Sequence, residues 1–102
     1  MRLSEQQRTE IVSAVRQAFG SDSRVWLFGS RVDDTARGGD IDLYVESAIS
    51  DAEQVVEARL GVLARLHRQL GERKIDMAVR RAQSTADVPI WRLARSTGVE
   101  LT

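Results

Sequence analysis

The spacing of apolar residues predicts a chain that alternates helices and strands. Near the start, Ser4 and Gln7 have the spacing of a capping box, and apolar residues then recur every three or four positions. We therefore expect a first helix that ends at the Gly-Ser-Asp-Ser run of residues 20–23. The expected buried face of this helix consists of Ile11, Val12, Val15, Ala18 and Phe19.

Three segments show strand patterns. Residues 25–28 form a short apolar run, in which we expect Trp26 to belong to the core. Residues 41–46 alternate apolar and polar side chains, the period of a strand with one covered face. Residues 75–80 repeat that alternation, so they are expected to form a third strand.

Two further helices are expected around the third strand. Ser50 and Glu53 have the spacing of a second capping box, which would open a long helix from about 52 to 70, closed by Gly71. Pro89 suits the first turn of a last helix. The stripe expected to be buried on the long helix consists of Val56, Leu60, Leu63, Leu66 and Leu70.

The expected architecture is a mixed α/β (α+β) fold in the order helix, strand, turn, strand, helix, strand, helix. The long helix is long enough to return the third strand parallel to the second. With 102 residues, the chain is expected to be one domain, 1–102.

Composition narrows the classes of function. Basic and acidic residues number 15 each, so the formal net charge is zero. That balance, without a stripe of basic and aromatic residues, disfavours direct binding of nucleic acid or a membrane surface. The chain has no cysteine, which excludes disulfides and thiolate metal sites and fits a reducing compartment. A polar start and the lack of long apolar runs predict no signal peptide and no membrane span, so the expected location is cytoplasmic.

Three aspartates are expected to meet on one face of the sheet. Asp40 and Asp42 project from the same face of their strand, roughly 6.6 Å apart along it, opposite the apolar residues of that strand. If the second and third strands are parallel neighbours, Asp76 emerges beside Asp42 on the same open face. The sequence led us to expect no basic residue within this acidic cluster. Such a cluster repels itself unless a cation holds it.

The residue types point to a metal and phosphates. Oxygen ligands without His or Cys suit Mg²⁺ or Mn²⁺. The turn at Gly29 and Ser30 lets a phosphate approach the backbone, and the serine hydroxyl and nearby amides can donate hydrogen bonds to it. Arg31 can pair with the same phosphates or with Asp33 and Asp34. The turn is thus expected to hold phosphates, and the aspartates the metal.

These residues also carry a family resemblance, in the run "FGSR…GDIDLYV…KIDMAVR". The chain resembles the nucleotidyltransferase superfamily that includes the palm of DNA polymerase beta, and looks most like the prokaryotic minimal nucleotidyltransferases. The resemblance implies a three-stranded mixed sheet flanked by helices, with its first two strands antiparallel. One departure is Gly39, where a serine more often precedes the first aspartate.

The resemblance also implies roles for the site residues. Gly29 and Ser30 would contact the triphosphate, and Asp40 and Asp42 would bind the metals. Asp76 would help to ligate the second metal and activate the incoming hydroxyl. The expected reaction is transfer of AMP from ATP to a hydroxyl acceptor.

The implied partner is a protein. Minimal nucleotidyltransferases of this kind are typically paired with a helical HEPN-type ribonuclease toxin and act as its antitoxin, so a tyrosine of the toxin is the expected acceptor. The chain has no room for a base-reading domain, and specificity is expected to come from a partner or a homo-oligomer. The expected docking surface is the last helix, with Ile90, Trp91 and Leu93. An alternative is a binding module that inhibits a partner by occlusion without catalysis.

Overall fold

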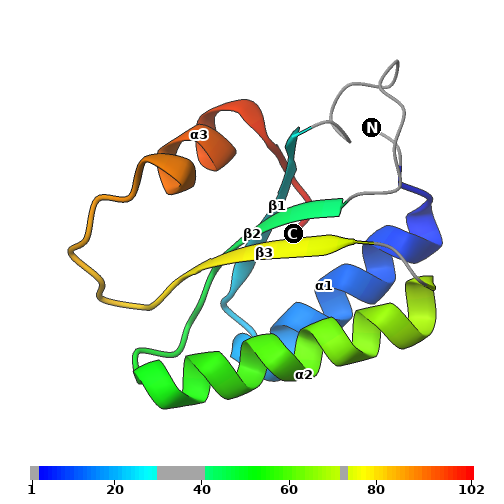
Figure 1. Cartoon of the computed structure of the whole chain (residues 1–102), viewed down its shortest axis with the longest axis horizontal. Helices are drawn as coiled ribbons and strands as arrows, with labels where there is room; N and C mark the ends of the chain where they lie inside the picture. Colours follow the sequence, from blue (N-terminus) through cyan, green and yellow to red (C-terminus); the bar gives the residue numbers. More distant parts are fainter. Residues whose placement is uncertain (1–2, 30–40, 72–73) are drawn as a thin grey trace.

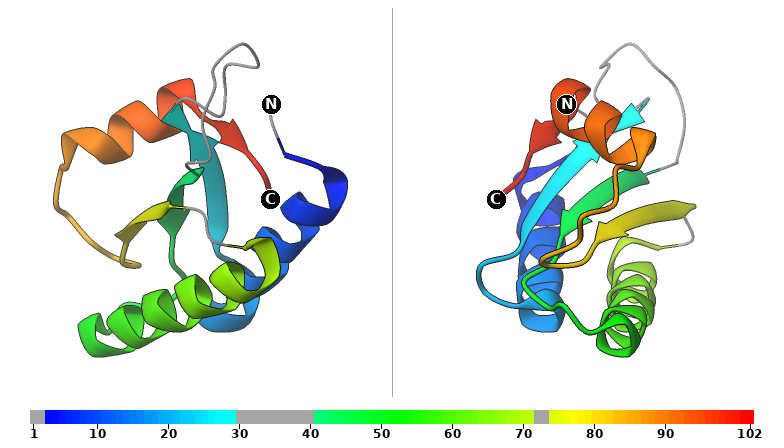
Figure 2. Two further views of the ribbon diagram at one scale, coloured as in Figure 1. Left: turned by 45° about the vertical axis from the view of Figure 1, so that its right-hand side comes forward. Right: turned by 90° about the vertical axis from the view of Figure 1, so that its left-hand side faces the viewer.

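A mixed β-sheet lies between two layers of helices in the computed structural model, which describes residues 3–29, 41–71 and 74–102 (Figure 1). Helices α1 and α2 cover one face of the sheet, and α3 packs on the other face (Figures 1 and 2). In chain order the elements are α1 (Glu5–Phe19), β1 (Arg24–Phe28), β2 (Ile41–Glu46), α2 (Ala52–Leu70), β3 (Ile75–Arg80), α3 (Pro89–Thr97) and β4 (Val99–Glu100).

The strand order is β3-β2-β1-β4. β1 pairs antiparallel with β2, and β2 pairs parallel with β3, which confirms the predicted directions of these three strands. The prediction of three strands is wrong, because a fourth strand pairs antiparallel with β1, and the element order ends in a strand rather than a helix. β4 has two residues, too few to show an alternating pattern in the sequence.

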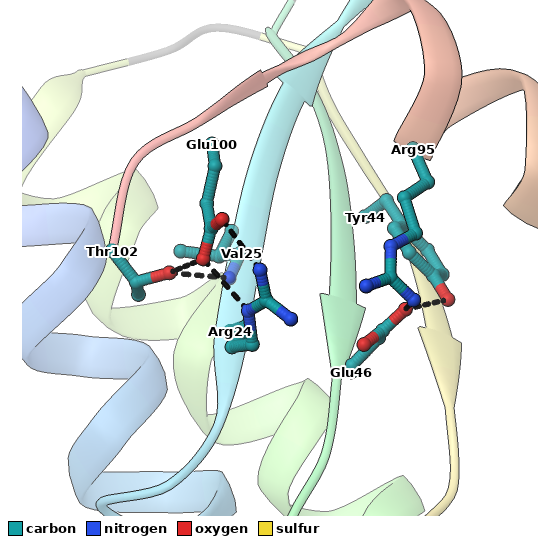
Figure 3. Close-up of polar contacts among 7 residues, drawn as sticks. All are labelled: Arg24, Val25, Tyr44, Glu46, Arg95, Glu100 and Thr102. Atoms are coloured by element: carbon teal, nitrogen blue, oxygen red, sulfur yellow. Dashed lines mark hydrogen bonds and ion pairs between the residues drawn. The ribbon is translucent and has the colours of Figure 1, made fainter.

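Side-chain contacts hold β4 and the chain end against β1 (Figure 3). The Arg24 guanidinium donates to both carboxylate oxygens of Glu100, at 2.7 and 2.8 Å, and the Thr102 hydroxyl donates to Glu100 at 2.7 Å. These hydrogen bonds, from Arg24 first and Thr102 second, lower the pKa of Glu100 to about 2. The Leu101 amide donates to the Val25 carbonyl, and the Leu101 side chain is buried. The last residues therefore form part of the fold.

The face under α1 and α2 is the main apolar core. The predicted capping box of Ser4 and Gln7 is present and starts α1. The capping box predicted at Ser50 and Glu53 is wrong, because the side chain of Asp51 caps α2 by accepting from the Gln54 amide at 2.9 Å. The most deeply buried residues of this core include Ile11, Val15, Phe19, Val25, Leu27, Ile41, Leu43, Val45, Val62 and Leu66.

The buried side of α2 agrees only in part with the predicted stripe: Leu66 is buried, and Leu63 and Leu70 pack against the core as predicted. Val55, Val62 and Leu66 are the buried residues of this helix, whereas Val56 and Leu60 are 57% and 59% exposed. Both sets satisfy a helical period, and the two adjacent valines at 55 and 56 allow either rotation. The position of α2 on the sheet therefore decides which valine faces the core.

Helix α3 covers part of the face that was expected to be open. Trp26 and Tyr44 are buried there together with Ala94 of α3, and their ring centroids lie 5.4 Å apart. Trp26 is thus in a core as predicted, but in a second, aromatic cluster on the aspartate side of the sheet. Among the described residues, the uncovered part of this face is reduced to the end that carries Asp42 and Asp76.

Candidate active site

Three of the predicted site residues lie in the described part of the chain. Gly29 directly follows β1, Asp42 is the second residue of β2, and Asp76 is the second residue of β3. The other three predicted residues, Ser30, Arg31 and Asp40, lie outside the described residues. Where β1 ends and β2 and β3 begin, the antiparallel and parallel pairings place the three strand ends next to one another.

Asp42 and Asp76 are direct neighbours across the parallel pair. The register aligns Asp42 with Asp76, so their backbones are about 4.8 Å apart. Both side chains project from the face opposite the main core, because Ile41 and Ile75 before them are buried in that core. Asp42 is half-buried, and the Asp76 side chain is 59% exposed. Two carboxylates therefore share one end of the sheet face.

The backbone after β1 runs directly over the Asp42 carboxylate. Gly29 has φ of 76°, a conformation that favours glycine, and a Cβ at this position would lie 2.5 Å from Asp42 Oδ2. No other residue would fit here without displacing the carboxylate or the turn. The glycine of the predicted phosphate-binding turn and the first described carboxylate thus belong to one site.

A cation that was not predicted lies in this site. Lys74 Nζ is 3.9 Å from Asp76 Oδ2, which contradicts the expectation of an acidic cluster without basic neighbours. The sequence does carry the signal, because residues two apart in a strand share a face, which places Lys74 on the side of Asp76. Both side chains are largely exposed, so this pair contributes little to stability.

At the other end of the same face, the Glu46 carboxylate is hydrogen-bonded to neighbouring side chains (Figure 3). The Tyr44 hydroxyl donates to Glu46 at 2.9 Å, and Arg95 of α3 donates to the same carboxylate oxygen at 3.3 Å. Burial, followed by the hydrogen bond to Glu46, raises the pKa of Tyr44 to about 12. These residues, with Arg80 and Trp91, line a cleft of about 360 Å³ beside α3. The Glu46 carboxylate thus accepts hydrogen bonds from two side chains. In this respect the Glu46 end of the face differs from the aspartate end.

The two described carboxylates fit a hard divalent cation. Carboxylate oxygens at a solvent-accessible strand end are the ligands that Mg²⁺ and Mn²⁺ prefer, and Mg²⁺ completes its shell with water and phosphate oxygens. Within the described ranges no group of three His, Cys, Asp or Glu side chains forms a metal cluster. The third predicted acid, Asp40, is not among those residues. Asp42 and Asp76, with Asp40, are the residues that would hold the metal.

Comparison with known proteins places the chain in a family. Residues 8–90 match the family model of the nucleotidyltransferase domain, and a comparison with curated proteins gave no match. In the described part of the chain, no helix combines the length and apolar character needed to span a membrane. Nucleotidyltransferase domains generally use a nucleoside triphosphate and a divalent metal. Because the match covers most of the sequence, from α1 to the start of α3, the chain belongs to the nucleotidyltransferase domain family.

Proposed function

We propose that this nucleotidyltransferase moves AMP from ATP to a hydroxyl group of another protein. The observation that carries the proposal is the meeting of Gly29, Asp42 and Asp76 at three adjacent strand ends. A turn that admits phosphates and a pair of carboxylates that suits a divalent cation are the two parts that phosphoryl chemistry requires. Both lie at the same end of the sheet.

Each residue has a distinct role in this proposal. Gly29 and Ser30 hold the triphosphate through the backbone and the serine hydroxyl, and Arg31 pairs with its charge. Asp40, Asp42 and Asp76 hold Mg²⁺ or Mn²⁺. When bound, this metal neutralises the charge on the phosphates. Lys74 pairs with Asp76 in the free protein and thereby limits repulsion between the carboxylates.

The transfer itself needs one proton acceptor and one leaving group. The acceptor oxygen forms a bond to the α-phosphorus while the bond from that phosphorus to the bridging oxygen breaks. Pyrophosphate leaves with the bonding electron pair, and the hydroxyl proton passes to the carboxylate of Asp76. Positioning and charge neutralisation supply most of the catalysis in such reactions, which a small scaffold can provide.

The acceptor belongs to a second molecule if it is a tyrosine. Tyr44 is the chain's single tyrosine, it is 1% exposed, and its hydroxyl donates to Glu46. A buried, hydrogen-bonded hydroxyl cannot reach the aspartate end of the same folded chain. The family resemblance supports a HEPN-type helical toxin as the acceptor, which makes the protein its antitoxin. Of the predicted docking residues, Ile90 and Leu93 of α3 are 41% and 53% exposed and available for docking the toxin, whereas Trp91 packs against the aromatic cluster.

The test is transfer of label from α-labelled ATP to a co-purified toxin protein in the presence of Mg²⁺. We expect labelled toxin with the wild type, none with chelator, and none with Asp42→Asn. Asp22→Asn is the matched control, because Asp22 is an exposed aspartate in the turn before β1 and should leave transfer unchanged. Neutralisation of the toxin by both the wild type and Asp42→Asn, without any AMP adduct, would instead establish inhibition by occlusion.

A further inference from the structure

Gly98 lies at the junction between α3 and β4, where the chain packs against the end of β1 (Figures 1 and 2). Its amide donates to the Ala94 carbonyl at 2.8 Å, which ends α3. Its φ of −81° is open to every type of residue, so the backbone conformation does not require a glycine. Any need for a glycine at this position must come from packing.

The space around Gly98 is closed mainly by backbone atoms. A Cβ at this position would lie 2.9 Å from the Leu27 carbonyl oxygen and 3.2 Å from Phe28 Cβ, and closer still to the Ala94 carbonyl oxygen. Contacts this short with backbone atoms are not relieved by rotating a side chain. A methyl group at residue 98 must therefore move the end of α3, the end of β1 or both.

The strand end that Gly98 contacts belongs to the candidate active site. On one side of β1, Leu27 pairs with β4, and on the other side Phe28 is in register with Asp42 of β2. The next residue, Gly29, lies over the Asp42 carboxylate. The end of β1 is thus held between the α3–β4 junction and the strand that carries Asp42, directly before the turn at Gly29.

We propose that Gly98 is a positioning residue for the turn at Gly29. Because it has no side chain, the α3–β4 junction closes directly on β1 and fixes the place of Gly29 over Asp42. This inference rests on the proposed function, in which the turn holds the triphosphate. A displaced turn binds the triphosphate less well both before and during transfer. The loss should therefore appear in KM for ATP rather than in kcat.

Steady-state transfer of label from α-labelled ATP to the co-purified toxin protein tests this role. Gly98→Ala should raise KM for ATP about tenfold and change kcat by less than about threefold. Gly61→Ala is the matched control, because a Cβ at Gly61 would meet no atom within 4 Å, so both constants should stay unchanged. The proposal would be overturned if Gly98→Ala left KM unchanged, whatever happened to kcat.

Glu100→Gln separates positioning of the turn from the general stability of β4. It removes the ion pair with Arg24, the first residue of β1, which lies at the opposite end of that strand from Gly29. This variant should lower the free energy of unfolding without raising KM for ATP. An equal rise in KM for Glu100→Gln and Gly98→Ala would instead show that any loosening of β4 has this effect, and would overturn a specific role for Gly98.

A second variant covers the case in which circular dichroism shows Gly98→Ala to be unfolded. Phe28→Ala truncates a half-buried ring that packs against the aromatic cluster, and so loosens the same strand end without adding a clash. KM for ATP should rise again, and an unchanged KM for this variant would overturn the proposal.

Titration calorimetry with ATP and Mg²⁺ separates this proposal from the proposed function. Gly98→Ala should bind ATP about tenfold more weakly than the wild type, whether or not AMP is transferred. A wild type that shows this difference but transfers no AMP would support the role of Gly98 and contradict the proposed function. Equal affinities in an active enzyme would overturn the role of Gly98 alone, and a wild type that binds no ATP would overturn both.

Discussion

The two faces of the sheet are built from alternate residues of the same strands, yet they differ in chemistry. In β2, Ile41, Leu43 and Val45 face the main core under α1 and α2, where apolar side chains dominate. Asp42, Tyr44 and Glu46 face the side covered by α3. The first face stabilises the fold by excluding water, whereas the second holds charges in defined places. Adjacent residues of one strand therefore serve different purposes: one stabilises the fold, and the next contributes to the face with the candidate site.

The second face is itself divided into two ends. At the end of Glu46, the carboxylate accepts hydrogen bonds from Tyr44 and Arg95, and the aromatic cluster packs beside it. At the other end, Lys74 Nζ lies 3.9 Å from the exposed carboxylate of Asp76. A carboxylate covered by a neighbouring helix contributes to the fold, while a carboxylate at a solvent-accessible strand end can bind a ligand. Substitutions on the two faces, and at the two ends of the second face, should therefore have different effects.

The largest effect is expected on the apolar face. Leu43→Ala removes a fully buried side chain from the middle of β2 and should lower the free energy of unfolding by about 4 kcal/mol, within a usual range of roughly 2–5 kcal/mol. Urea titration followed by circular dichroism measures this loss. Leu60→Ala is the control, since this leucine is 59% exposed and its removal should cost no more than about 0.5 kcal/mol. Equal losses for both variants would contradict the described core.

The next effect is expected on activity alone. Asp42→Asn should reduce nucleotidyl transfer by on the order of 10²–10³, or about 3 kcal/mol in the barrier, because it removes a charged ligand from the site. The variant should remain folded at the assay temperature, because Asn has nearly the volume of Asp and Asp42 lies outside the main apolar core. Single-turnover rates and differential scanning calorimetry measure the two quantities. Loss of activity caused by unfolding would count against a role for Asp42 in the chemistry.

The paired end of the second face should respond to alkaline pH. Burial and the hydrogen bond to Glu46 raise the pKa of Tyr44 from 10.0 to about 12. The protonated form is favoured by the fold, so this stabilisation is complete below pH 10 and is lost as pH rises towards 12, by about 2 kcal/mol. Absorbance of tyrosinate at 295 nm reports this residue alone, because the chain has one tyrosine. Glu46→Gln should lower the pKa of Tyr44, and an unchanged titration would contradict the role of this hydrogen bond.

The smallest effect is expected at β4. The pKa of Glu100 is lowered from 4.5 to about 2, chiefly by its hydrogen bond to Arg24. The resulting stabilisation is present above pH 4.5 and is lost as pH falls towards 2. Because these side chains are 31% and 45% exposed, solvent screening reduces it to roughly 1 kcal/mol or less. Urea unfolding between pH 5 and 2.5 measures it, and Glu100→Gln should remove this part of the acid sensitivity.

The strands and helices with clear periods were predictable from the sequence. The bounds of β2 and the start of α3 at Pro89 agree with their patterns, and a long crossover helix was sufficient to predict that β2 and β3 run parallel. The fourth strand was not predictable, because two residues carry no period and their partners in β1, Trp26 and Leu27, are distant in the sequence. The position of Lys74 beside Asp76 could have been predicted, because residues two apart in an extended chain lie on the same face.

The sequence by itself determined which residues share a face. Alternation groups Asp42 with Tyr44 and Glu46, and the helical period groups Val55 with Val62 and Leu66, whatever surrounds them. Only the tertiary structure decided which of these faces is covered, and by which element. α3 packs over Tyr44 and leaves Asp42 near its edge, and α2 turns Val55 rather than Val56 inward. Periodicity is a local property of the backbone. Burial depends on which element packs against a face and on how much apolar area that contact removes from water.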